Sequence, residues 1–216
     1  MNVGIYVYDQ AEVLDFSGPF EVFSTASRIC PSGDPFKVFL VGETGAVVVA
    51  RGGFRVTPAY GFQNHPSVDV LIVAGGVHRY EIAKPKVLDW ISAVAEKATL
   101  VASVCTGAFL LAEAGVLTTQ QVTTHWEDVD DLRTGYPGLT VHESKRWVDE
   151  GRIVTSGGIS AGIDMCLHLV GRLYGPDAAR KTARQMEFNW ISEPDAAEQV
   201  VNDASTHPCG YPRRRS

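Results

Sequence analysis

The chain has 216 residues, of which 45% are apolar and 20% are charged, a size and composition that suit one α/β domain better than two. The 25 acidic and 19 basic residues give a formal net charge of -6, which argues against broad binding to nucleic acid, because such binding needs a positive field along phosphate. No apolar run approaches the roughly 18 residues that span a bilayer, and the N-terminus carries no targeting signal. We therefore expect a cytoplasmic protein without a nucleic-acid or membrane partner.

Apolar runs of strand length alternate with helical patterns along the chain. Strands are predicted over residues 3–8, 36–41, 68–74 and 99–104. Helices are predicted over residues 18–28, 84–97 and 159–173, with a further helix from Pro176 to about Asn189. Glycine-containing turns predict two hairpins beside the main sheet, over residues 47–57 and 145–155.

Strand–helix–strand repetition predicts right-handed crossovers and a doubly wound, mostly parallel sheet with helices on both faces, accompanied by a small β-hairpin. A single domain is expected over residues 1–191. Residues 192–216 form a polar C-terminal tail that ends in Arg213-Arg214-Arg215, a triplet that we interpret as a solvated end.

One of the four cysteines stands apart. Cys30, Cys166 and Cys209 are expected to be small buried residues with inert thiols, and neither a disulfide framework nor a metal site is indicated by the spacing. Cys105 lies where a buried strand passes directly into a helix predicted over residues 108–114, with Gly107 permitting the tight bend. This order is that of a hydrolase nucleophile elbow, which presents its nucleophile at the carboxyl end of the sheet.

The start of the following helix favours an anion, so a Cys105 thiolate is expected near neutral pH. The alternative is a cysteine that merely ends a buried strand. Gly75 and Gly76, at the end of the preceding strand and followed by Val77, can present backbone N–H groups to a ligand. With the N–H of Thr106 these groups would form an oxyanion hole, and an ordinary tight turn is the alternative.

An acidic residue completes the candidate site. Asp15 is flanked by Leu14 and Phe16 just ahead of a predicted helix start, so it is either an N-terminal capping carboxylate or an acid held in an apolar pocket. In the pocket, desolvation and a neighbouring thiolate would raise its pKa. Asp15 would then donate a hydrogen bond to the thiolate and later act as a general acid.

Five segments taken in order resemble the ThiJ/PfpI superfamily from residue 3 to about residue 190. They are D-F-S-G-P from Asp15, A-G-G from Ala74, S-V-C-T-G around Cys105, V-T-T-H-W around His125 and S-G-G-I-S-A-G-I-D from Ser156. Within the superfamily the chain is most similar to isocyanide hydratases and to the amidotransferase-like domains of AraC-type regulators. The resemblance implies a flavodoxin-like α/β sandwich, a homodimer and a reactive cysteine at a strained elbow, with no cofactor and no metal.

The resemblance also assigns roles to single residues. Cys105 matches the nucleophile, Asp15 matches the acidic residue that hydrogen-bonds its sulfur, and Thr106 follows the nucleophile as in the hydratases. Gly75 and Gly76, with Val77 after them, match the lining of the nucleophile pocket. His125 could form a Cys–His pair, but the hydratase chemistry relies on the acid, so His125 is interpreted as an accessory hydrogen-bonding residue.

The chain departs from the family at three places. Thr106 stands where protease-like members carry His, which argues against peptidase activity. Ala74 stands where hydratases often have Pro, and Val77-His78-Arg79-Tyr80 replaces a small, Gly-rich run. His78 and Arg79 would favour a polar or anionic ligand.

The sequence therefore predicts a cysteine-dependent hydratase that converts a small-molecule isocyanide and water into an N-substituted formamide. One alternative is a glyoxalase-type enzyme that acts on α-oxoaldehydes. Another is a non-catalytic ligand-sensing or redox-sensing regulatory domain without its DNA-binding part, since the residues after Trp190 are too few for paired helix-turn-helix units.

Overall fold

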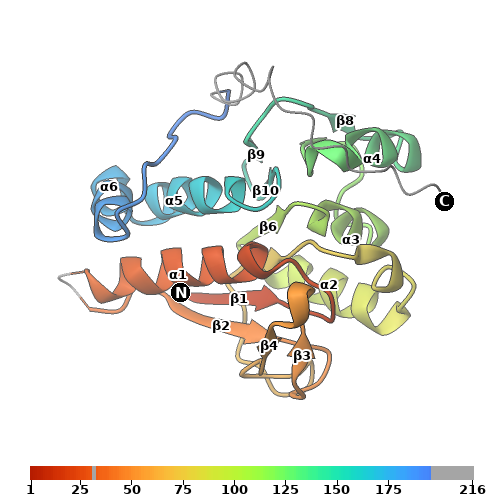
Figure 1. The fold of residues 1–216 in the computed structure, drawn as a ribbon, viewed down its shortest axis with the longest axis horizontal. Coiled ribbons are helices and arrows are strands. Elements are labelled where there is room, and N and C mark those ends of the chain that lie inside the picture. The colour runs from red at the N-terminus through yellow and green to blue at the C-terminus, as the bar shows by residue number, and fades with distance from the viewer. Residues whose placement is uncertain (31–32, 196–216) are drawn as a thin grey trace.

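The computed structural model describes residues 1–30 and 33–195 (Figure 1). Its centre is a six-stranded sheet with the order β2-β1-β5-β6-β10-β9. The strands are β1 (Asn2–Tyr6), β2 (Lys37–Val41), β5 (Val70–Val73), β6 (Leu100–Val104), β9 (Trp147–Glu150) and β10 (Ile153–Ser156). All neighbours pair in parallel except β9, which runs antiparallel to β10. The five parallel strands follow the flavodoxin-like order 2-1-3-4-5, so the predicted fold class is confirmed.

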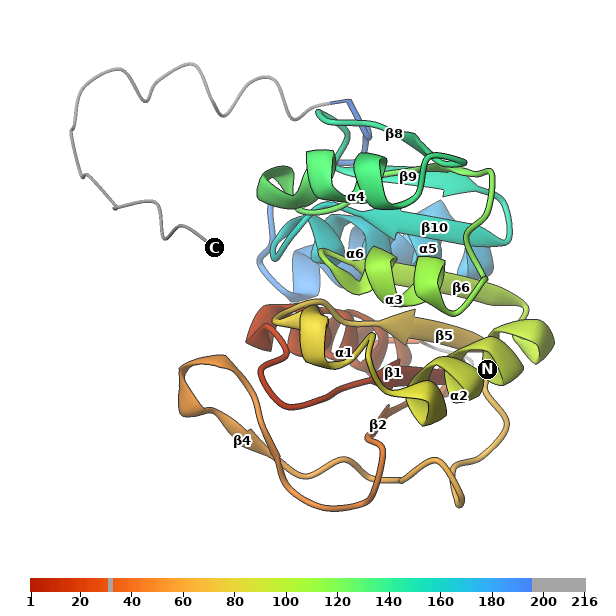
Figure 2. The ribbon, with the colours of Figure 1, turned by 90° about the vertical axis from the view of Figure 1, so that its right-hand side faces the viewer.

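Helices cover both faces of this sheet (Figure 2). On one face lie α1 (Val13–Arg28), α5 (Ala161–Tyr174) and α6 (Pro176–Gln185), and on the other lie α2 (Pro85–Lys97), α3 (Gly107–Glu113) and α4 (Val129–Gly135). The two central strands β5 and β6 are buried along their whole length, because helices cover them on both sides. The carboxyl ends of β1, β5 and β6 meet at one edge, where ligands of doubly wound folds bind.

The smaller elements lie around this edge. The predicted hairpin is formed by β3 (Val48–Val49) and β4 (Arg55–Val56), joined through the 3₁₀ turn η1 (Arg51–Gly53). The sequence did not predict α4, the short parallel pair β7 (Gln121–Val122) and β8 (Thr140–Val141), or the 3₁₀ turns η2 (His78–Tyr80) and η3 (Trp126–Asp128).

Two predicted helix starts were wrong, and both corrections concern the site. Helix α1 begins at Val13 and runs through Pro19, because Phe16 and Phe23 lie on one apolar face that continues across the proline. Asp15 is therefore in the first turn of the helix, not ahead of it. Helix α5 begins at Ala161, since Ile159 has a φ of +55° and cannot be helical.

Two further expectations were also wrong. The hairpin over residues 145–155 belongs to the main sheet, because Ile153–Ser156 is buried throughout and pairs with β6. Helix α6 ends at Gln185 rather than near Asn189, and Glu187 has a φ of +51°. Such a left-handed residue does not continue a helix.

The remaining cysteines differ from one another. Cys166 is wholly buried, as expected, but Cys30 is half-buried just beyond α1, with its sulfur 3.0 Å from the Tyr174 hydroxyl. Cys209 and the predictions for residues 196–216 lie outside the described residues. In the described part of the chain, no helix is both long and apolar enough to cross a bilayer.

Candidate active site

Cys105 occupies a strained turn between β6 and α3. Its φ is +56°, in the left-handed region that non-glycine residues rarely adopt. The turn is held on both sides, since the Cys105 N–H donates to the carbonyls of Ser156 and Gly157 at 3.2 Å each, and the Thr124 hydroxyl donates to the Cys105 carbonyl at 2.8 Å. These bonds fix the predicted elbow in place.

Gly107 permits the close approach of the elbow to the neighbouring strand. A Cβ at this position would lie 2.2 Å from the Val73 carbonyl oxygen, so only glycine allows α3 to begin so near β5. The sequence-based interpretation of Gly107 is confirmed.

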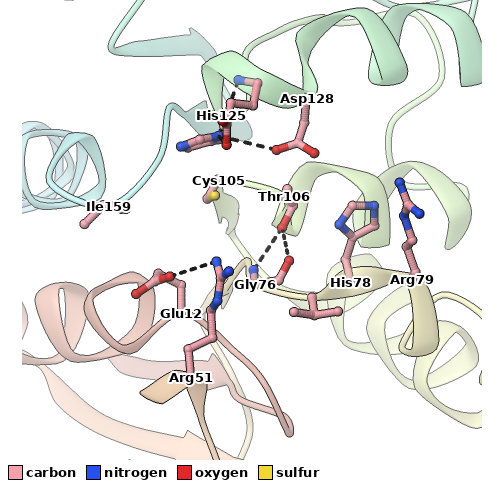
Figure 3. A pocket seen from close by; sticks show the side chains of 12 residues that line it. Glu12, Arg51, Gly76, His78, Arg79, Cys105, Thr106, His125, Asp128 and Ile159 are labelled. Carbon is pink, nitrogen blue, oxygen red and sulfur yellow. Dashed lines mark hydrogen bonds and ion pairs between the residues drawn. The ribbon is translucent and has the colours of Figure 1, made fainter. Parts of the chain in front are cut away.

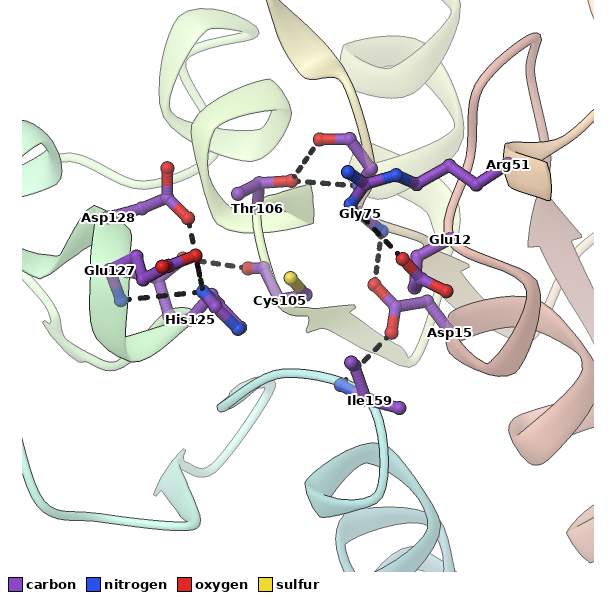
Figure 4. Close-up of polar contacts among 12 residues, drawn as sticks. Glu12, Asp15, Arg51, Gly75, Cys105, Thr106, His125, Glu127, Asp128 and Ile159 are labelled. Carbon is purple, nitrogen blue, oxygen red and sulfur yellow. Dashed lines mark hydrogen bonds and ion pairs between the residues drawn. The ribbon is translucent and has the colours of Figure 1, made fainter. Parts of the chain in front are cut away.

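Asp15 lies beside the sulfur, wholly buried in the first turn of α1 (Figure 4). Its Oδ1 accepts the Ile159 N–H at 3.1 Å and its Oδ2 accepts the Gly75 N–H at 3.2 Å, and its carboxyl group is hydrogen-bonded to Cys105. Burial raises the pKa of Asp15 from 3.8 to about 7, with the Glu12 charge adding to the rise, although these hydrogen bonds oppose it. The carboxyl group is thus an acid in an apolar pocket that titrates near neutral pH.

The Cys105 thiol behaves differently from the expectation. Burial raises its pKa above the ordinary value, and the Asp15 charge raises it further, while the hydrogen bond from the Thr106 N–H lowers it by less. The expected resting thiolate is therefore wrong, because desolvation outweighs the helix start. Near neutral pH the thiol keeps its proton while the Asp15 carboxyl group is partly ionised, so a carboxylate that can accept the thiol proton lies beside the sulfur.

The paired glycines leave room for the neighbouring residues of the site, but their backbone N–H groups are not free to bind a ligand. The Gly75 N–H donates to Asp15, the Gly76 N–H donates to Thr106 Oγ1 at 2.9 Å, and the Val77 N–H donates to the Gln10 carbonyl at 3.1 Å. The predicted oxyanion hole built from Gly75 and Gly76 is therefore wrong, since both N–H groups are already used inside the protein. Through these hydrogen bonds the two glycines fix the positions of Asp15 and Thr106.

Thr106 joins the elbow to the end of β5. Its hydroxyl accepts from the Gly76 N–H and donates to the Gly76 carbonyl, each at 2.9 Å. A Cβ at Gly75 would lie 2.6 Å from the Thr106 backbone nitrogen and 2.8 Å from Asp15 Oδ2. Cys105, Asp15 and the segment after β5 are consequently packed against one another with no room for a further methyl group.

His125 lies beside the sulfur but points its Nδ1 atom away from it. Nδ1 is 3.4 Å from Asp128 Oδ2, and this hydrogen bond is the main reason that the pKa of His125 is raised. A Cβ at Gly158 would touch both the His125 ring and the Cys105 sulfur, so the ring forms one wall of the site. The accessory hydrogen-bonding role of His125 stays a prediction.

A cavity of about 240 Å³ opens onto the sulfur (Figure 3). Cys105, Thr106 and His125 line one part of it, and Val77 with His78 and Arg79 lines another. Asp15 is not among the lining residues. It lies behind the Cys105 side chain, so the atoms of a bound molecule that it can reach are those that come to lie next to the sulfur.

Sequence reasoning missed five residues of this cavity, namely Glu12, Arg51, Glu127, Asp128 and Ile159. Glu12 lies three residues before the predicted acid and Ile159 stands within the recognised S-G-G-I-S segment, so both carried a local signal. Glu127 and Asp128 follow His125, which also stood in a recognised segment. Arg51 carried no such signal, because the hairpin reaches the cavity only through tertiary folding.

The model of the DJ-1/PfpI family matches residues 1–172. The chain belongs to this family. The chain is also similar to isonitrile hydratase of Pseudomonas putida, with 33% identity over 209 residues that cover 94% of this chain and 87% of the hydratase. The resemblance to this family found in the sequence is thus confirmed.

Transcriptional regulators are also among the proteins to which this chain is similar. The HTH-type transcriptional regulator GbdR of Pseudomonas aeruginosa is 29% identical over 92% of this chain, which spans 54% of the regulator. A THiJ/PfpI family protein from Pseudomonas syringae has a structure with a TM-score of 0.79 and 25% identity, covering 87% of this chain and 75% of that one. DJ-1beta of Drosophila melanogaster shares the fold, with a TM-score of 0.73 and 18% identity over 88% of this chain and 98% of its own.

Proposed function

We propose that this protein is a cofactor-free, cysteine-dependent hydratase that converts a small isocyanide and water into an N-substituted formamide. The observation that carries the proposal is the hydrogen-bonded pair of Cys105 and buried Asp15 at a small cavity, with a carboxyl pKa of about 7. The 33% identity to isonitrile hydratase over most of both chains supports the same chemistry. Isonitrile is another name for isocyanide.

In the first half of the reaction, the Asp15 carboxylate takes the thiol proton while the sulfur of Cys105 attacks the terminal carbon of the isocyanide. A C–S bond forms, and the carbon becomes carbanionic. Asp15, now protonated, delivers the same proton to this carbon, which gives a thioimidate and restores the carboxylate. One proton is thus carried from sulfur to carbon by one carboxyl group whose pKa suits transfer in both directions.

In the second half, a water molecule adds to the thioimidate carbon, and the Asp15 carboxylate accepts one of its protons. Asp15 passes this proton to the former isocyanide nitrogen, and a tetrahedral adduct forms that carries a hydroxyl group and the sulfur of Cys105. As this adduct collapses, the C–S bond breaks, the Asp15 carboxylate takes the hydroxyl proton and passes it to the departing sulfur, and the formamide is released with the thiol restored. The net reaction adds one water molecule to the isocyanide and consumes nothing else.

The test compares wild type with Cys105→Ala and Asp15→Asn, with isobutyl isocyanide as substrate and formamide formation followed by NMR. We expect no turnover with Cys105→Ala, and kcat lowered by about 10²- to 10⁴-fold with Asp15→Asn, the usual contribution of general acid–base catalysis. Cys166→Ala is the matched control, since Cys166 is also buried but lies in α5 outside the cavity lining. Full activity of Cys105→Ala would refute the mechanism.

A ligand-sensing role is the second candidate, because the regulator GbdR is 29% identical to 92% of this chain. Under that function the protein binds a small molecule and releases no product, so the same NMR assay separates the two. Methylglyoxal in a parallel reaction tests the glyoxalase alternative through lactate formation. A redox-sensing role is disfavoured, because the thiolate is the form of cysteine that is oxidised and the pKa of the Cys105 thiol is raised.

A further inference from the structure

Arg51 is placed at the cavity by the hairpin of β3 and β4, which takes no part in the central sheet. The Arg51 N–H donates to the Ala11 carbonyl at 3.0 Å, and the Gln10 N–H donates to the Val49 carbonyl at 2.8 Å. Asp9 accepts the Val49 N–H through its carboxylate at 2.8 Å. The hairpin is thereby fixed to the segment that leads into α1, and its tip carries an arginine toward the nucleophile.

The guanidinium group of Arg51 faces the cavity that also contains the Cys105 sulfur (Figures 3 and 4). Within the part of the chain that the structure describes, its side chain is bonded to Glu12 alone, with Nη1 3.2 Å from Oε2. A guanidinium has five N–H donors in a planar fork that matches a carboxylate. Most of these donors therefore remain available to a bound molecule.

Charge is distributed unevenly around the cavity. Glu127 and Asp128 belong to η3, and both lie near the His125 Nδ1 atom, at 3.8 and 3.4 Å. Arg51 lies on another side of the cavity, whereas Arg79, which is exposed and also lines the cavity, lies beside His78 and away from Arg51 (Figure 3). An anionic group is consequently attracted to the Arg51 side and repelled from η3.

The size of the cavity limits how far apart the two ends of a ligand can be. A volume of about 240 Å³ holds a single small molecule. A compound that places an electrophilic carbon on Cys105 can therefore place a carboxylate on Arg51 only if a short chain separates them.

We propose that Arg51 is a specificity-determining residue that binds the carboxylate of the substrate, so that the preferred substrates are short isocyanides bearing a carboxylate, the isocyano-carboxylic acids. This inference rests on the proposed hydratase function. The carboxylate forms a two-point contact with the guanidinium, which turns the isocyanide carbon toward the sulfur.

The test uses two substrates of similar size, isocyanoacetate and the neutral isobutyl isocyanide. Wild type is expected to have the lower KM for isocyanoacetate. Arg51→Gln should raise the KM of isocyanoacetate relative to that of isobutyl isocyanide by about 10- to 100-fold, the range that corresponds to one hydrogen bond to a charged group. Arg55→Gln is the matched control on the same hairpin, since Arg55 is exposed and outside the cavity lining, and it should leave both KM values unchanged.

Glu12→Gln provides a change in the opposite direction. Removing the carboxylate that competes for Arg51 should lower the KM of isocyanoacetate by roughly two- to five-fold, the strength of a partly exposed ion pair. If Arg51→Gln leaves the ratio of the two KM values as it is in wild type, the inference is overturned.

Failure of the hydratase function would give a different result, because wild type would then hydrate neither isocyanide. In that case calorimetric titration with N-formylglycine, the product expected from isocyanoacetate, tests the carboxylate site alone. Binding to wild type that is about 10- to 100-fold weaker in Arg51→Gln supports the site. Equal binding to both proteins, or none to wild type, overturns it.

Discussion

Replacing Asp15 with asparagine should abolish most activity and yet stabilise the folded protein at alkaline pH. The carboxyl group is wholly buried, and its pKa is raised from 3.8 to about 7, chiefly by burial. Because the unfolded chain loses this proton near its ordinary pKa, the folded state binds more protons between about pH 4 and pH 7. The free energy of unfolding therefore falls as the pH rises through this window.

The size of the effect follows from the shift. The pKa rises by about three units, and each unit corresponds to about 1.4 kcal/mol. Ionised Asp15 therefore destabilises the folded protein by about 4 kcal/mol above pH 7. Asparagine removes the charge, but its NH₂ group faces either the Gly75 or the Ile159 N–H, and one lost hydrogen bond costs about 1–3 kcal/mol. Asp15→Asn should therefore be more stable than wild type by about 1–3 kcal/mol above pH 8, and less stable by a similar amount near pH 4.

Urea unfolding of both proteins at several values between about pH 4.5 and pH 8.5 measures this difference. The sign of the stability difference should reverse within that range, whereas Asp89→Asn should show no such reversal, because Asp89 is exposed on α2. A difference between Asp15→Asn and wild type that stays constant with pH would show that the buried carboxyl group does not titrate near 7, and would refute the reasoning.

Three further outcomes are expected. First, kcat/KM should increase with pH through a midpoint near 7, because Asp15 must be ionised to accept the thiol proton. A stopped assay at several pH values measures kcat/KM, and a midpoint near 4 would contradict this role of Asp15. Second, Thr106→Val should lower stability by about 1–3 kcal/mol through loss of both hydrogen bonds to Gly76, while Thr106→Ser should keep thermal stability near that of wild type. Third, Gly75→Ala should lower the free energy of unfolding by about 1–3 kcal/mol and remove most of the activity, since its Cβ would lie within 2.8 Å of three atoms. Gly45→Ala is the control, because nothing lies within 4 Å of a Cβ at that position. Equal denaturation midpoints for the two variants would contradict the steric argument.

Much of the fold was predictable because local signals agreed with the tertiary environment. The strands that became β5 and β6 were recognisable as continuous apolar runs, since helices cover them on both faces. The predictions failed where local and tertiary signals differed. The helix was predicted to begin at residue 18, but the apolar face on both sides of Pro19 extended α1 back to Val13.

Some residues of the candidate site were predictable from the sequence, but its electrostatics were not. Cys105 and Asp15 were identified from sequence, and the structure brings their side chains together. The helix-start argument predicted a thiolate, because a sequence pattern shows that a helix begins after the cysteine but not how deeply the sulfur is buried. Burial decides the outcome, since removing a charge from water outweighs one backbone hydrogen bond.

The sequence by itself determined an α/β fold with a doubly wound sheet and a cysteine at a strand–helix elbow, because these depend on apolar periodicity, glycine positions and motif order. Only the tertiary structure decided that the Gly75 and Gly76 amides are already occupied, and that Arg51 reaches the cavity from a separate hairpin. The physical reason is the distance along the chain over which each kind of signal acts. Periodicity reports the environment of neighbouring residues, whereas hydrogen-bond partners, desolvation and the charge facing a ligand are set by residues that lie tens of positions apart in the chain.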